Sequence, residues 1–205
     1  MSMAQRERQD LVRTMADVGP DAPTLCAGWM VRDLAAHLIV RERRLDAAPG
    51  ILLKPFAGYL EKVQRGVAQR PFPEVLERIR TGPPVFLRPV DSAMNAVEMF
   101  VHHEDVRRAG PGWEPRELPA ADQDRLWKAL SGMGRMAYRR SPVTVVLATP
   151  DGRRMVPRDA GERTVVLTGP PSELLLHAFG RDEVRLEASG APEDIETVHA
   201  LSRGF

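Results

Sequence analysis

What this 205-residue sequence lacks already excludes several classes of protein. Its single cysteine, Cys26, cannot form a disulfide within the chain. That indicates a reducing compartment, and we expect a cytoplasmic protein. No apolar run approaches the roughly 18 residues that a membrane-spanning helix needs, and the polar N-terminal stretch carries no apolar core of a secretory signal. We therefore expect neither a membrane protein nor a secreted one.

A strong net charge is also absent. Acidic and basic residues almost balance, with a formal net charge of +1, so the sequence predicts no binding to nucleic acid or to membrane surfaces. Hydrophobic residues make up 43% of the chain and charged residues 28%. This composition is typical of a globular protein with a buried core and excludes a disordered chain.

The first two-thirds of the sequence show helical periodicity. Apolar residues recur at intervals of three and four, and breaks such as Gly19-Pro20 interrupt the pattern. Helices are expected at residues 2–18, 29–45, 56–67, 73–80, from 91 or 92 to 109, and 120–138.

The pattern changes after Ser141 and Pro142. Segments rich in β-branched residues predict strands, and two short helices follow them. The strands are expected at residues 143–148, 163–168 and 184–188, and the helices at 172–179 and 192–201. We therefore expect an α+β fold, with a helical bundle over residues 1–140 and a small α+β domain over residues 141–205.

The most informative motif is a glutamate and a histidine one helical turn apart, Glu98 and His102. A helix advances about 100° per residue, so residues four apart lie on the same face. A third candidate ligand, His37, lies in another expected helix. Two histidines and one glutamate from two helices would form a divalent-metal site with an open coordination position, which is typical of catalytic sites.

The same residues have simpler interpretations. Glu98 and His102 could be a surface ion pair that contributes a few tenths of a kcal/mol, and His37 alone could be a core histidine. The surroundings favour the metal, because Asn95, Glu98, His102 and Asp105 form a polar line on an otherwise apolar helix. Buried polar groups need partners, and a metal ion would supply one.

Three neighbours of this pair have roles that the sequence leaves open. His103 lies about 140° round the helix from Glu98, so we expect it to support a ligand, face the substrate or be exposed. Glu104 is expected to be solvated. Asp105, one turn beyond His102, either orients that ring, as carboxylates often do at metal sites, or is solvated.

Cys26 also has two interpretations. A nucleophile or a fourth metal ligand would need a nearby base or cation, and its own segment offers none before Arg32. We therefore interpret Cys26 as a small buried hydrophobic residue.

Two segments resemble a known family. Residues 24–38 resemble the segment that opens the N-terminal domain of mycothiol-dependent maleylpyruvate isomerases, and residues 97–106 resemble its Glu-x-x-x-His-His-x-Asp helix. That domain belongs to the DinB-like superfamily of four-helix-bundle metalloenzymes, and an uncharacterised metal-binding subfamily from actinobacteria is closer still. The resemblance covers roughly residues 5–140. Beyond it, Leu174–Arg181 resembles the leucine-rich helix of the isomerase's small C-terminal domain, but lacks that helix's tryptophan.

The resemblance implies a zinc-type site of His37, Glu98 and His102 that water or substrate completes. Nickel or iron could occupy the same ligands, depending on supply. It also implies an intracellular enzyme that uses a low-molecular-weight thiol such as mycothiol to isomerise a small-molecule substrate or to transfer the thiol to it. A cation would hold the substrate carboxylate, and a homodimer is an arrangement that the sequence allows. The candidate catalytic residues are Arg181, Arg32 and His103.

Two other functions stay open. The protein could be a non-catalytic metal-binding or ligand-sensing module whose C-terminal domain recognises the ligand. It could also be a metal-dependent hydrolase with His103 or Glu104 as general base. Neither residue is expected on the ligand face of the helix, which argues against the hydrolase.

Overall fold

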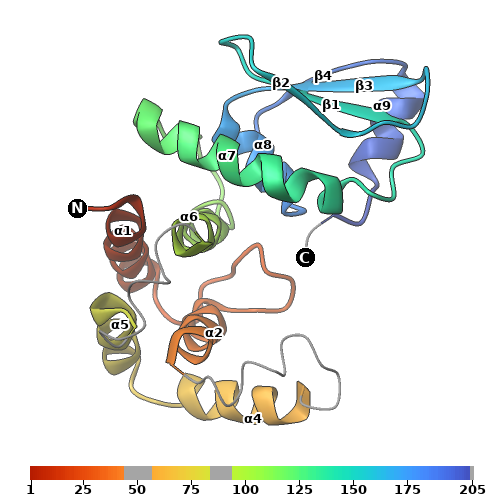
Figure 1. Cartoon of the computed structure of the whole chain (residues 1–205). Coiled ribbons are helices and arrows are strands. Elements are labelled where there is room, and N and C mark those ends of the chain that lie inside the picture. The colour runs from red at the N-terminus through yellow and green to blue at the C-terminus, as the bar shows by residue number, and fades with distance from the viewer. Residues whose placement is uncertain (44–56, 84–93, 204–205) are drawn as a thin grey trace. The chain divides into compact units, whose positions relative to one another are not determined.

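The computed structural model describes residues 1–43, 57–83 and 94–203, and within them the chain contains helices and a four-stranded sheet (Figure 1). This confirms the α+β class, with a helical part followed by a small part that contains the sheet. The chain divides into two compact units, Met1–Trp113 and Glu114–Phe205. The expected helix start at 91 or 92 and the expected helical residues 44 and 45 lie outside the described residues.

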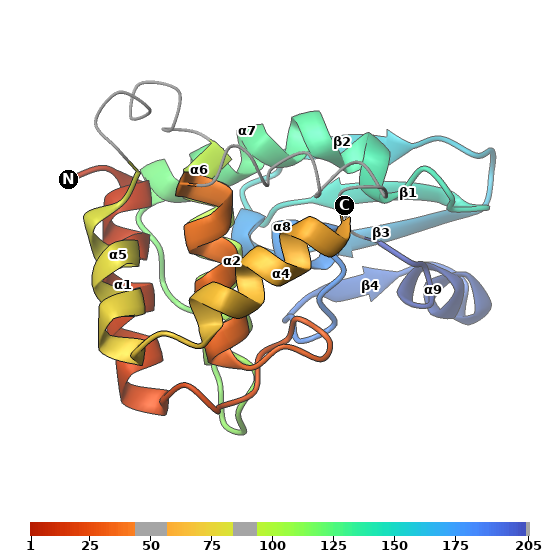
Figure 2. The same cartoon turned by 90° about the horizontal axis from the view of Figure 1, so that it is seen from below.

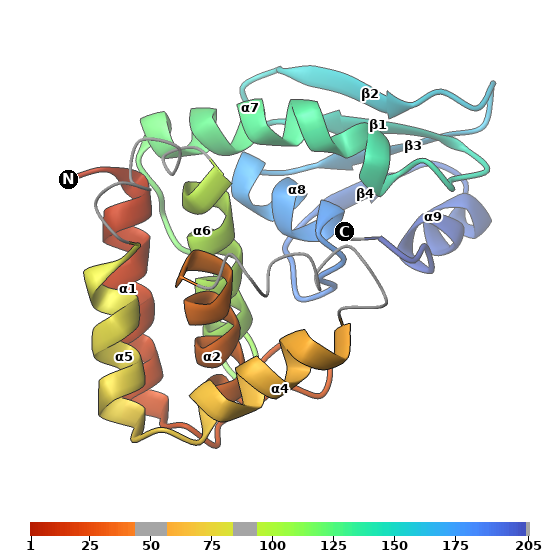
Figure 3. The same ribbon diagram turned by 60° about the horizontal axis from the view of Figure 1, so that its bottom comes forward.

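The first unit is a bundle of helices. They are α1 (Met3–Val18), α2 (Val31–Arg43), α4 (Ala57–Ala68), α5 (Phe72–Thr81) and α6 (Met94–Arg107). Figure 1 shows α1, α2, α5 and α6 end-on as a four-membered bundle, Figure 2 shows α1 beside α5, and Figure 3 shows α4 crossing α2 obliquely. At every described end the bounds lie within two residues of the predicted ones.

Local sequence signals set the ends of α1. The Ser2 hydroxyl accepts a hydrogen bond from the Gln5 amide, and the Gln5 side chain accepts one from the Ser2 amide, which together form a capping box. The helix ends at Gly19, whose φ of 87° is a conformation that favours glycine.

Apolar side chains from α1, α2 and α5 fill the bundle. Leu11, Leu34 and Ile79 are almost completely buried in one cluster. A buried ion pair joins Arg8 of α1 to Glu42 of α2, and Arg8 also donates a hydrogen bond to the Ile79 carbonyl of α5 at 3.0 Å. Arg8 therefore links three helices. Replacing either Arg8 or Glu42 would leave an unpaired buried charge, which is strongly destabilising.

The second unit places three helices on one side of a mixed sheet (Figure 1). The helices are α7 (Ala120–Ala137), α8 (Pro171–Ala178) and α9 (Pro192–His199); the strands are β1 (Thr144–Ala148), β2 (Arg154–Arg158), β3 (Thr164–Thr168) and β4 (Glu187–Ser189). The strand order is β2-β1-β3-β4, with β1 parallel to β3 and both outer strands antiparallel to their neighbours. Burial alternates along β3, where Val165 and Leu167 are fully buried, as expected for a strand with one face on a core.

The sequence-based prediction misses β2. Pro157 lies inside this strand and arginines stand at both ends, a composition that predicts a loop. Because β2 is an edge strand of the sheet, one side of its backbone has no ladder partner among the described residues, and the proline is tolerated. α7 packs on β2 and α8, so it belongs to the second unit. The predicted domain boundary at residue 140 stays a prediction.

None of the helices in the described residues is long and apolar enough to cross a membrane.

Candidate metal centre

Three side chains from α2 and α6 converge on one point. The Nε2 atoms of His102 and His37 lie 3.2 Å and 3.8 Å from the Oε1 atom of Glu98. One potential ligand atom of each residue lies within 4.8 Å of the others. The side chains are between 11% and 22% exposed, so all three are largely buried but keep some contact with solvent. The structure brings the three predicted ligands together, and their role as ligands stays a prediction.

The polar line on α6 explains why these groups meet there. Asn95, His102 and Asp105 are buried, and Glu98 is largely buried, although α6 is otherwise apolar. Each member of the line contacts a polar side chain of another residue. The helical spacing sets the line, and the packing of α2 beside α6 brings His37 to it.

The outer nitrogen of each candidate histidine is held by a neighbour. Of the two roles that the sequence leaves open for Asp105, the structure has the orienting one: Asp105 is buried beside His102 and accepts a hydrogen bond from Nδ1 of that ring at 2.9 Å. The amide nitrogen Nε2 of Gln64 on α4 lies 3.1 Å from Nδ1 of His37 and donates to it, and the Trp29 ring packs beside His37 with centroids 5.1 Å apart. In this arrangement the ring proton of His37 is on Nε2 and faces Glu98; a reversed Gln64 amide, with its oxygen toward Nδ1, would leave Nε2 with a lone pair for a metal. Such supporting hydrogen bonds are usual at metal sites.

Cys26 contacts the same support. Its thiol donates a hydrogen bond to Oδ2 of Asp105 at 3.1 Å, and its sulfur lies 3.9 Å from Nδ1 of His102. It also packs, partly buried, against the core of the bundle. Cys26 is therefore a hydrogen-bond donor as well as the small hydrophobic residue that the sequence predicts. Cys26, His102 and Asp105 form a second group of potential ligand atoms, on the far side of the His102 ring from Glu98.

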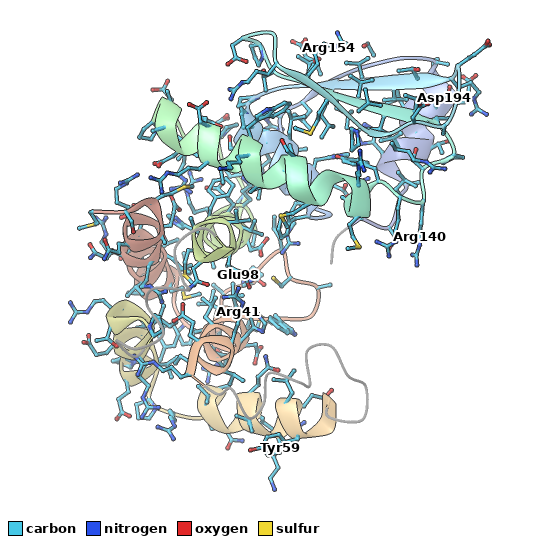
Figure 4. All side chains as sticks on the ribbon, viewed as in Figure 1. Arg41, Tyr59, Glu98, Arg140, Arg154 and Asp194 are labelled. Carbon is cyan, nitrogen blue, oxygen red and sulfur yellow. The ribbon has the colours of Figure 1, made fainter. Side chains whose placement is uncertain are left out.

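Arg41 was given no role by the sequence, yet it reaches the convergence point. Its Nε lies 3.2 Å from Oε1 of Glu98, and its Nη1 donates a hydrogen bond to Oδ1 of Asn95 at 2.7 Å. Figure 4 shows the labelled Arg41 and Glu98 side chains between α2 and α6. The signal that could have found it is its spacing, because Arg41 stands four residues after His37 on α2.

Charge partners override burial at this point. Burial raises the pKa of Glu98, but hydrogen bonds from His102 and His37 and the charge of Arg41 hold that pKa well below its ordinary value. Burial lowers the pKa of His102, but hydrogen bonds with Asp105, Cys26 and Glu98 raise it well above 6.5. Without a metal the centre therefore holds a proton on His102, and metal binding would release it.

The donor set fits a zinc-type ion. Imidazole nitrogen and carboxylate oxygen are ordinary zinc ligands, and three of them with solvent access leave a position for a further ligand. Both Nε2 atoms face the same carboxylate oxygen, so one ion could contact all three residues after small side-chain movements.

His103 and Glu104 lie elsewhere on α6. His103 is buried, with Nδ1 3.0 Å from Glu7 and Nε2 3.0 Å from Thr14, both on α1. The prediction that Glu104 is solvated is wrong, because this side chain is 1% exposed and pairs with Arg107 and Arg108. Neither residue is directed at the candidate ligands, in agreement with the angle between them along the helix.

The two candidate arginines also stand apart from the ligands. Arg32 pairs with Asp21 at 2.8 Å and lines a cavity of about 500 Å³ between α2 and α4. Gln64 lines the same cavity, which therefore lies on the Nδ1 side of His37, away from Glu98. Arg181 belongs to the second unit, where it donates a hydrogen bond to the Phe179 carbonyl. Their roles stay predictions.

Comparison with known proteins identifies the fold. No protein-family model and no curated protein sequence matches the chain. A crystal structure of the mycothiol-dependent maleylpyruvate isomerase aligns with a TM-score of 0.61 at 15% identity, over 91% of this chain and 90% of that one. A histidine-to-alanine mutant of that enzyme aligns over the same shares with a TM-score of 0.63 at 14% identity. The resemblance predicted from the sequence is thus confirmed at the level of the fold.

Proposed function

We propose that this protein is a metal-dependent enzyme that uses a low-molecular-weight thiol to act on a small-molecule electrophile, as an isomerase or a thiol transferase. The observation that carries the proposal is the convergence of ligand atoms of His37, Glu98 and His102, all partly exposed side chains, on one point. Three protein donors and an open position are typical of catalytic zinc sites. We propose zinc as the metal, and nickel or iron would suit the same donors.

The thiol is supported by the fold. The two solved structures compared above, which share it, are of a mycothiol-dependent maleylpyruvate isomerase, so mycothiol is the thiol we propose. A free thiol has a pKa near 8.5, and the thiolate is the nucleophile. A bound zinc ion would supply the positive charge that favours the thiolate at neutral pH.

The chain's own residues would orient that metal. Asp105 keeps the Nδ1 proton of His102 in place, so the Nε2 lone pair of that ring is directed at the metal position. Gln64 would do the same for His37 with its amide oxygen, rather than its nitrogen, turned toward Nδ1 of that ring. The cavity beside Arg32 offers room for part of a polar cofactor, to which Arg32 would contribute its charge.

A hydrolase is supported less well. It needs a general base on the ligand side of α6, and the sequence offers His103 or Glu104 for that role. Both are buried in contacts with other side chains: His103 with Glu7 and Thr14, and Glu104 with two arginines. The same contacts give no support to a catalytic role of His103 in the thiol reaction.

Metal content of the purified protein tests the centre. By inductively coupled plasma mass spectrometry we expect about one zinc per chain in the wild-type protein. His37→Ala and Glu98→Gln should each lose most of this zinc, because each removes one of three donors. Glu77→Gln is the matched control, since Glu77 is an exposed carboxylate of α5 paired with Arg80. Equal metal in all four proteins would refute the site.

Thermal unfolding of the zinc-loaded protein tests the thiol. Mycothiol should raise the melting temperature more than 2-mercaptoethanol at the same concentration, because the ligand that binds the native state more tightly stabilises it more. Glu98→Gln should remove the difference. An equal response of the wild-type protein to both thiols would leave mycothiol without support.

A further inference from the structure

A fixed cation stands beside the three candidate ligands. Arg41 follows His37 by one turn of α2 and lies 3.2 Å from the same Glu98 oxygen that both imidazoles face. Its side chain is 20% exposed, so the guanidinium is within reach of a ligand that enters from solvent. Two α2 side chains one turn apart thus contact the same α6 carboxylate.

The guanidinium has binding capacity left. Its five N–H groups form a planar fork that matches a carboxylate. Among the described residues, Arg41 uses Nη1 for Asn95 and directs Nε toward Glu98. Asn95 is buried on α6 and fixes the position of the fork. The other N–H groups on its two terminal nitrogens have no hydrogen-bond partner among the described residues.

A divalent ion would change the role of Arg41. Without one, the guanidinium balances the charge of Glu98. An ion held by His37, Glu98 and His102 would draw on the same Glu98 charge and would add a second positive charge beside the guanidinium. A negatively charged group of a ligand would then be favoured next to Arg41, whose position Asn95 still fixes.

We propose that Arg41 is the specificity-determining residue of the centre: it binds the carboxylate of a ligand that occupies the open metal position. The inference rests on the proposed function and deepens it, because it selects carboxylate-bearing small molecules as ligands. It also assigns the anchoring of that carboxylate to Arg41 rather than to Arg32, which lies on the other side of His37.

Matched pairs of small thiols test the proposal. The probes are mercaptoacetate against 2-mercaptoethanol and 3-mercaptopropionate against 3-mercapto-1-propanol, titrated into the Co²⁺-loaded full-length protein, with the visible absorption of the cobalt as readout. The two chain lengths allow for reach. We expect the wild-type protein to bind at least one acid about tenfold or more tighter than its alcohol, as a charged hydrogen bond should give.

Two Arg41 variants and a control separate binding from folding. Arg41→Met should lose the preference while binding Co²⁺ and the alcohols within about threefold of wild type, and Arg41→Lys should keep part of it because the charge remains but the fork does not. Arg13→Met, an exposed arginine of α1 paired with Asp10, should behave as wild type.

The outcomes distinguish the two proposals. If no thiol alters the cobalt spectrum of the wild-type protein, the thiol function fails and the role of Arg41 falls with it. If the thiols bind without preference for the acids, or if both Arg41 variants keep the full preference, the role of Arg41 is refuted and the thiol function stands. Loss of Co²⁺ binding in Arg41→Lys and Arg41→Met, with the fold intact by circular dichroism, would show that Arg41 only supports Glu98 and would also refute the inference.

Discussion

Each unit of the molecule buries a histidine, and the two environments are opposite in charge. His102 in the first unit lies between two carboxylates, with Asp105 at Nδ1 and Glu98 at Nε2. His177 in the second unit accepts or donates one hydrogen bond, between Nδ1 and the Tyr138 hydroxyl at 2.7 Å, and its Nε2 has no hydrogen-bond partner among the described residues. Burial is similar, so the neighbours alone make the difference.

The pKa values of the two rings diverge for this reason. Burial lowers the pKa of both, but Asp105, with Cys26 and Glu98, raises the pKa of His102 well above 6.5. At His177 burial acts together with the positive charges of Arg203 and His199 and lowers the pKa to about 3. Carboxylates beside a buried histidine favour a positive charge there, whereas positively charged neighbours oppose one. This is why the first unit, and not the tyrosine–histidine pair, is the candidate metal centre.

Zinc should therefore stabilise the protein through one histidine and not the other. At a zinc concentration of about 100 times Kd, we expect the free energy of unfolding to rise by about 2.7 kcal/mol, measured by urea denaturation with and without zinc. His102→Gln should remove this increment because it deletes a donor. His177→Gln should keep it, and a loss of the increment in His177→Gln would break the contrast between the two sites.

The uncharged state of His177 predicts a pH dependence. A ring whose pKa is about 3 in the folded chain and 6.5 in the unfolded one stabilises the fold above the unfolded value. This stabilisation is lost as the pH falls toward 3, because only the unfolded state takes up the proton. Between pH 7 and pH 5 this loss lowers the free energy of unfolding by about 2 kcal/mol.

The measurement compares wild type with His177→Gln in metal-free buffer, where the slope of unfolding free energy against pH should be shallower in the variant. The charged groups around the ring are Arg203, which pairs with Asp182, and His199, with Tyr138 as the titratable partner. These are present in both proteins, so parallel profiles would mean that His177 is not held neutral.

Much of the fold could be predicted because its signals are local. Glycine and proline breaks and apolar spacing place the helices, and β-branched runs place β1 and β3. The edge strand β2 carries Pro157 and terminal arginines, and it forms through pairing with β1 across a turn. The residues of β2 themselves carry no pattern that predicts this pairing.

In the candidate site, too, features within one helix could be predicted, and contacts between helices could not. The spacing of Glu98 and His102 lies within one helix and is visible in the sequence. Gln64 meets His37 from another helix, 27 positions along the chain, and carries no local signal. Glu104 was misjudged because solvation was inferred from its direction on α6, whereas that side of the helix is also covered and its charge is met by arginines one turn on.

The smallest expected effect tests the tyrosine–histidine pair directly. Tyr138→Phe keeps the stacked ring, whose centroid lies 5.9 Å from that of His177, and removes only the hydroxyl. His177 then has a buried Nδ1 without its partner, which should lower the free energy of unfolding by about 1–2 kcal/mol. Tyr59→Phe, at the exposed tyrosine of α4, is the matched control and should change the free energy by less than about 0.5 kcal/mol.

Since neither change touches a carboxylate near His102, zinc affinity should stay the same in both variants. A weaker zinc affinity in Tyr138→Phe would show that the two histidine sites are coupled, and the contrast in their charge would no longer explain which of them binds metal.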